Sequence, residues 1–102
     1  MQPEFVRLHR RVVASITTLE PTEREALWRK LTALHNLPPD RWSEEGVTLL
    51  PGDDQVYFVP VTDSLRTFIS RMPEGGILIE DFVRQEFLDR YFGQSKEPVQ
   101  QK

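Results

Sequence analysis

Residues 56–84 read VYFVPVTDSLRTFISRMPEGGILIEDFVR, and this stretch decides the fold class. Three runs rich in strand-forming residues follow one another, at residues 56–61, 65–71 and 77–83. The sequence Pro73-Glu74-Gly75-Gly76 between the last two runs is a strong turn signal. Pro60 lacks a backbone N–H, so the first strand should end there, carry a bulge, or have that position at an edge. Short connections of this kind predict antiparallel strands.

Two helical patterns precede the strands. From Pro3 to about Thr18, apolar residues recur every three or four positions, as expected for one face of a helix: Phe5, Leu8, Val12, Ile16 and Leu19. A second helix should start at Thr22, which can cap it while Glu25 reaches back to the backbone, and it should stop before Pro38. The break between the two patterns is short, so we expect an antiparallel helical hairpin.

The remaining segments complete an α+β fold. Residues 47–50 are a short apolar run that suits a further strand, and residues 84–92 read as a short C-terminal helix. The sequence thus predicts an N-terminal helical hairpin packed on a three- to four-stranded antiparallel sheet. We expect one domain over residues 1–93 and a disordered tail over residues 94–102.

Composition narrows the function classes. The chain has 102 residues and no cysteine, which excludes disulfides, thiolate metal sites and a cysteine nucleophile. It has 13 Lys+Arg and 16 Asp+Glu, a net charge of −3. Residues 1–37 carry six basic and four acidic residues, whereas residues 38–102 carry seven and twelve. No run is long enough for a signal segment or a membrane span, so we expect a cytoplasmic protein that does not contact a membrane.

Common catalytic and cofactor motifs are missing from the sequence. Gly75-Gly76 lacks the Lys-Ser/Thr of a phosphate loop, and there is no nucleophile elbow. His9 and His35 are not at metal-ligand spacing. We therefore expect no cofactor and no metal.

Glu80 and Asp81 are adjacent carboxylates in the last predicted strand. Neighbours in a strand point to opposite faces, so this pair should not act together on one substrate. Asp81 has the strand parity of Ile77 and Ile79, and Arg66 on the preceding strand is a plausible ion-pair partner if that face is buried.

Arg66, Arg84 and Tyr91 form the one constellation that suits catalysis. Two arginines with a tyrosine can bind a phosphate and move a proton. The structural alternative is that Arg66 pairs with Asp81, Arg84 opens the last helix and Tyr91 packs as a core residue. The residues alone favour the structural alternative.

The stretch YFVPVTDSLRTFI at residues 57–69, followed after a turn by ILIEDFVR at residues 77–84, resembles the RelE/ParE toxin superfamily. The resemblance covers about residues 20–92. It implies a helical hairpin followed by a curled antiparallel sheet. It also implies that Arg66 matches the family's strand arginine, Arg84 the arginine at the end of the last strand, and Tyr91 the C-terminal tyrosine.

The resemblance implies the toxin member of a toxin–antitoxin pair, acting on translation or on DNA gyrase. Its partner would be a cognate, antitoxin-like protein. Its target would be the ribosome with its mRNA, or gyrase. A homodimer is a further possible assembly. If the chain is an enzyme, it is an endoribonuclease with Arg66 and Arg84 on phosphate and Tyr91 in proton transfer. The alternative is a non-catalytic interaction module with a toxin-like fold. The acidic second part of the chain favours this alternative, as does the lack of any lysine between Lys30 and Lys96.

Overall fold

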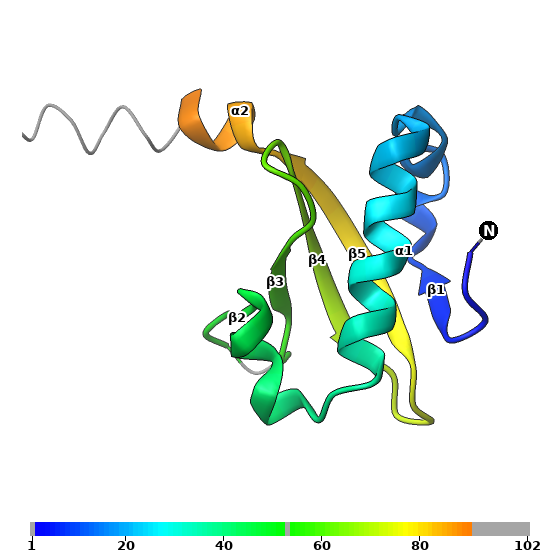
Figure 1. The fold of residues 1–102 in the computed structure, drawn as a ribbon, viewed down its shortest axis with the longest axis vertical. Helices are drawn as coiled ribbons and strands as arrows, with labels where there is room; N and C mark the ends of the chain where they lie inside the picture. The colour runs from blue at the N-terminus through cyan, green and yellow to red at the C-terminus, as the bar shows by residue number, and fades with distance from the viewer. Residues whose placement is uncertain (1, 53, 91–102) are drawn as a thin grey trace, which may run out of the picture.

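The computed structural model describes residues 2–52 and 54–90 of the chain (Figure 1). Most of its helical segments precede a run of four consecutive strands. The elements are, along the chain, strand β1 (Val6–Leu8), the 3-10 helices η1 (Arg10–Val12) and η2 (Ser15–Thr18), helix α1 (Pro21–His35), the 3-10 helix η3 (Pro39–Glu45), strands β2 (Thr48–Leu49), β3 (Tyr57–Pro60), β4 (Leu65–Arg71) and β5 (Ile77–Arg84), and helix α2 (Gln85–Leu88).

The five strands form one sheet in the order β1-β5-β4-β3-β2. The β2–β3, β3–β4 and β4–β5 pairs are antiparallel, as their short connections predict. β3 ends at Pro60, which is one of the outcomes expected for a proline at that position. The α+β class is confirmed, but the count of three to four strands is wrong, because β1 adds a fifth strand parallel to β5.

The predicted N-terminal helical hairpin is wrong in its first half. Residues 6–8 form β1, and two 3-10 helices follow, so α1 is the one long helix among the described residues. The backbone of this segment bonds to β5: Ile77 N–H donates to Phe5 O at 2.8 Å, and His9 N–H donates to Ile79 O at 2.9 Å. These bonds satisfy the free edge of β5, which a helix at the same place would leave unpaired.

Gly76 permits this close approach of β1 to β5. Its φ of +101° lies in the region that side chains with a Cβ disfavour, and a Cβ there would lie 2.7 Å from the carbonyl oxygen of Phe5. The turn before β5 therefore serves two purposes, since it reverses the chain and also leaves room for the N-terminal strand.

Helix α1 follows the predicted pattern, with a different start. Leu27, Leu31 and Leu34 are its buried residues, and the helix ends at His35, ahead of the prolines. The cap is Glu20 rather than Thr22: the Glu20 side chain accepts from the backbone N–H of Glu23, and the Glu23 side chain accepts from that of Glu20 at 2.9 Å. Pro21 then takes the first helical position, where its missing N–H costs nothing.

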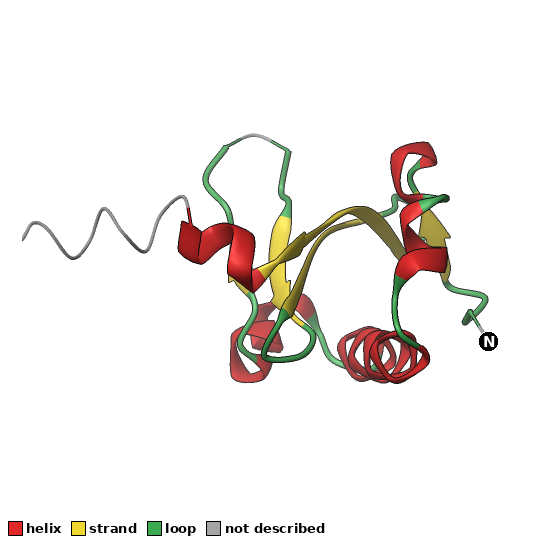
Figure 2. Cartoon of the chain, turned by 90° about the horizontal axis from the view of Figure 1, so that it is seen from above, coloured by secondary structure: helices red, strands yellow, loops and turns green. Residues whose placement is uncertain are grey.

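The sheet has a covered face and an open face. Figure 2 shows α1 lying below the curved sheet, and no helix of the described part lies above β4 and β5. On β4, alternate residues are buried against the α1 side, namely Leu65, Thr67 and Ile69. Among the residues that the structure describes, Thr67 is the one buried polar residue, and its hydroxyl donates to Asp81 O at 2.8 Å.

The C-terminal helix begins where it was expected. α2 starts directly after Arg84, and the rest of the predicted helix beyond Arg90 lies outside the described residues. The predicted tail over residues 94–102 lies outside them as well. In the part of the chain that the structure describes, no helix is both long and apolar enough to span a bilayer.

Candidate functional site

We call the sheet face opposite α1 the outer face. It is formed by the side chains of β3, β4 and β5 that point away from α1. In an antiparallel ladder, paired residues share a face, and Phe58 pairs with Phe68 there. The two rings lie 5.1 Å apart at 49°, and both are partly exposed. Further members of this face follow from the register: Pro60, Arg66, Ser70, Leu78, Asp81 and Val83.

Arg66 lies on the outer face, paired with Pro60 on β3 and Val83 on β5. Its guanidinium Nη1 donates to the backbone carbonyls of Thr62 and Leu65, the latter at 3.2 Å. No acidic side chain pairs with it among the described residues. The cation is therefore tied to the end of the β3–β4 connection while it stays partly exposed on the open face.

Arg84 lies on the α1 side of the sheet, because it pairs in register with the buried Leu65. Its guanidinium forms a two-pronged ion pair with Glu23: Nη1 bonds Oε2, and Nη2 donates to Oε1 at 3.0 Å. The hydrogen bond from Arg84 lowers the pKa of Glu23 despite the opposing effect of burial, and the same bond raises the pKa of Arg84. Glu23 thus joins the start of α1 to the end of β5.

The two predicted site arginines therefore point to opposite faces of the sheet. Residues 65 and 66 are neighbours on β4, so their register partners Arg84 and Val83 belong to different faces. Tyr91, the third predicted site residue, lies outside the described residues. The structure does not bring Arg66 and Arg84 to one point, and the catalytic assignment of the three residues stays a prediction.

A bulge in β5 changes the faces expected for Glu80 and Asp81. The β4–β5 register shifts between Phe68 and Ile69, so Asp81 pairs with Phe68 on the outer face instead of sharing the face of Ile79. Glu80 Oε2 accepts from Ser70 Oγ at 2.7 Å, which places it on the outer face as well. The expected Arg66–Asp81 pair is wrong, since Asp81 Oδ1 instead accepts from the backbone N–H of Phe82 at 2.9 Å.

A groove of about 560 Å³ lies where the outer face meets α2. Phe68 and Val83 contribute from the sheet, and Phe87 and Leu88 from the helix. Asp81 and Arg84 also line it, but the Arg84 guanidinium bonds to Glu23 on the α1 side, so the groove itself is mainly apolar. Its size and character suit an apolar side chain of a partner better than a polar substrate.

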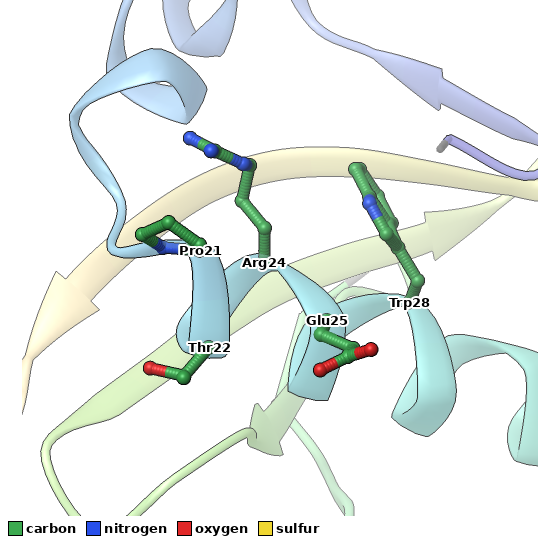
Figure 3. A pocket seen from close by; sticks show the side chains of 5 residues that line it. All are labelled: Pro21, Thr22, Arg24, Glu25 and Trp28. Atoms are coloured by element: carbon green, nitrogen blue, oxygen red, sulfur yellow. The ribbon is translucent and has the colours of Figure 1, made fainter.

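Another hollow, of about 320 Å³, lies at the start of α1 (Figure 3). Figure 3 shows Arg24 and Trp28 projecting together on one side of the helix, with Thr22 and Glu25 on the other. Arg24 Nη1 already donates to Leu19 O at 2.9 Å. The hollow contains none of the predicted site residues.

The two histidines lie in unrelated settings. The His9 ring accepts from the backbone N–H of Arg11 at 3.2 Å, and the His35 ring stacks on Phe5 with centroids 3.9 Å apart. Within residues 2–52 and 54–90, no three His, Cys, Asp or Glu residues are grouped so as to hold a metal ion.

Sequence reasoning missed two features of this region. The Phe58–Phe68 pair could have been found by aligning the predicted hairpin, because both residues alternate with the core positions of their strands. The Glu23–Arg84 pair joins residues 61 positions apart, and no local signal marks it.

Comparison with known proteins rests on structure alone. No described protein family and no curated protein matches the sequence. The structure matches a chain from the archaeal RelE–RelB complex of Pyrococcus horikoshii OT3 with a TM-score of 0.59 and 18% identity. The match covers 78% of this chain and 92% of that chain. This likeness shows that the chain has the fold of the RelE toxins.

Proposed function

We propose that the chain is the toxin-family member of a toxin–antitoxin pair, acting in the cytoplasm, and that its natural partner is an antitoxin-like protein. The single observation that carries the proposal is the RelE fold, matched over 92% of a chain from a RelE–RelB complex. Fold and function often separate, so the partner and the target of the toxin are two parts of the proposal that need separate tests.

The open face of the sheet supports a protein partner. Phe58 and Phe68 form a partly exposed aromatic pair, and the adjoining groove by α2 is mainly apolar. Contiguous apolar surface of this kind is typical of interfaces, where aromatic side chains supply much of the binding free energy.

The proposed target is translation, with mRNA on the ribosome as substrate, or DNA gyrase. In the nuclease version, Arg66 and Arg84 contact phosphate and Tyr91 transfers a proton. Arg66 is on the open face and available for this role. Arg84 would have to leave Glu23 and turn toward the outer face, which costs a two-pronged charged hydrogen bond.

A non-catalytic interaction module with the same fold is the second candidate. The Glu23–Arg84 pair favours it, because it gives Arg84 a structural role that needs no substrate. The excess of acidic residues after residue 37 favours it too, since a negative field opposes the approach of RNA.

Induction of the chain in bacteria tests the proposal. A toxin should arrest growth, and mapping of transcripts and assays of gyrase supercoiling then separate the two targets. Unchanged growth, intact messages and normal supercoiling together would reject the toxin role.

Alanine variants separate the nuclease from the interaction module. If Arg66→Ala and Arg84→Ala abolish message cleavage while the protein stays folded, the nuclease assignment holds. If Arg84→Ala lowers thermal stability and cleavage is absent in every variant, the module is favoured. Arg29→Ala is the matched control, because Arg29 is an exposed α1 arginine with only a 4.0 Å contact to Glu25.

A further inference from the structure

The free edge of β2 presents unpaired strand backbone. β2 is the last strand of the described sheet, so β3 is its one neighbour there. Leu50 N–H donates to Val56 O at 2.9 Å, and hydrogen-bonded and non-bonded pairs alternate along an antiparallel ladder. Leu49, which faces Tyr57, is therefore in a non-bonded pair. Its own N–H and C=O point away from β3 and are available to another strand.

An apolar hollow of about 340 Å³ lies beside this edge, between η3 and the β2–β3 pair. Its lining includes Trp42 and Tyr57, whose rings meet edge to face at 4.8 Å. The Leu49 side chain also lines it and is 53% exposed, which is unusual for a leucine in a strand. Since side chains alternate along a strand, every second residue of an added strand would point toward this hollow.

The surroundings of the hollow are acidic. Residues 38–56 contain five acidic residues and one basic residue. Arg41 is neutralised by Glu44 at 3.0 Å, and Lys30 of α1 pairs with Glu45 at 3.3 Å. Asp40, which lines the hollow, and Asp54 are in no ion pair within the described part of the chain. The acidic charge that remains attracts a cationic segment and repels an anionic one.

We propose that the β2 edge docks an extended segment of a partner protein in which apolar residues alternate with lysine or arginine. Backbone bonds to Leu49 would fix the segment, and its apolar side chains would enter the hollow. Its cations would project from the opposite side of the added strand, where they would be attracted by the acidic charge around this edge, which includes Asp54 in the β2–β3 connection. A second copy of this chain is a poor occupant, because it would bring a second acidic β2 edge against the first. The inference goes beyond the toxin proposal and does not depend on it.

A labelled nine-residue peptide of alternating valine and lysine is the probe, and its valine–glutamate counterpart is the control. We expect the lysine peptide to raise fluorescence anisotropy on addition of the full chain and to slow hydrogen exchange of the Leu49 amide, with the glutamate peptide bound at least about tenfold more weakly. Equal binding of both peptides, or unchanged exchange at Leu49, would overturn the proposal.

Two variants test the two kinds of contact. Leu49→Pro removes the outward N–H without removing a ladder bond, and we expect it to bind the lysine peptide about fivefold more weakly than Leu49→Ala, which keeps that N–H. Asp54→Asn should weaken binding about threefold, whereas Asp63→Asn, the same change in the β3–β4 connection, should not. The proposal is wrong if Leu49→Pro and Leu49→Ala bind alike, or if both aspartate variants weaken binding equally. Growth arrest on induction is a separate measurement, so failure here leaves the toxin proposal in place.

Discussion

The two faces of the β4–β5 hairpin come from one alternating sequence, but they differ in burial. On the α1 side, Ile69 and Ile79 are fully buried. On the outer face, Phe68 and Leu78 occupy the neighbouring positions and stay partly exposed. The apolar character of both faces shows that hydrophobicity alone does not decide burial. What decides it is whether another element covers the face, and here α1 covers one and no described helix covers the other.

The largest expected effect compares Ile79→Ala with Leu78→Ala. These neighbours have similar side chains that point to opposite faces. Ile79→Ala should lower the free energy of unfolding by about 3–4 kcal/mol through lost burial and a cavity, and Leu78→Ala by about 1 kcal/mol. Urea unfolding measures both. Equal losses would show that the outer face is covered in the isolated chain.

The next largest effect is expected at the Glu23–Arg84 ion pair, which joins α1 to the end of β5. Glu23→Gln keeps an oxygen that can accept from the Glu20 N–H but removes the charge that holds Arg84. The Arg84 side chain is 38% exposed, so solvent screens the pair, and we expect a loss of about 1 kcal/mol by urea unfolding. Glu25→Gln is the control, since Glu25 lies in the same region of α1 with its side chain 75% exposed, and it should change stability little.

The same pair predicts a dependence on pH. Because Arg84 lowers the pKa of Glu23 in the folded chain, the carboxylate stabilises the fold above its ordinary pKa of 4.5. That contribution is lost as the pH falls below 4.5 and through the lowered folded value. The stability difference between the wild-type chain and Glu23→Gln should therefore be full at neutral pH and shrink in acid. A difference that stays constant from neutral pH to strong acid would contradict the assignment.

The smallest expected effect is at Arg66. Its cation is partly exposed and bonds to two backbone carbonyls at the end of the β3–β4 connection. Arg66→Ala should lower the free energy of unfolding by about 0.5 kcal/mol or less. If thermal unfolding instead showed a loss as large as that of Glu23→Gln, Arg66 would be a structural residue and a weaker candidate for phosphate binding.

Predictions from local pattern succeeded where burial and covalent geometry act over a few residues. Leu27, Leu31 and Leu34 repeat at helical spacing and are buried, and the turn at residues 73–76 joins two antiparallel strands. The β5 bulge was beyond such reasoning, because one extra residue reverses every later side chain, and Asp81 changed face as a result.

The N-terminal segment is a second place where local pattern failed to predict the structure. Its apolar spacing fits a helix, yet Val6 rather than Phe5 is buried, because residues 6–8 bond to β5 as a strand. The pattern could not show that β5 had a free edge or that Gly76 left room for a neighbour. Pairing of residues 6–8 with the edge of β5 therefore outweighed the weak helical preference of this segment.

By itself, the sequence determined the α+β class, helix α1, the antiparallel hairpins and the resemblance to the RelE superfamily. These depend on local periodicity and turn residues, which act within about ten positions. Only the tertiary structure decided that the chain starts with a parallel strand, that Arg66 and Arg84 point to opposite faces, and that Glu23 holds Arg84. Those facts depend on register and on contacts between residues far apart in sequence. No local pattern encodes such contacts, because their partners meet only once the sheet has formed.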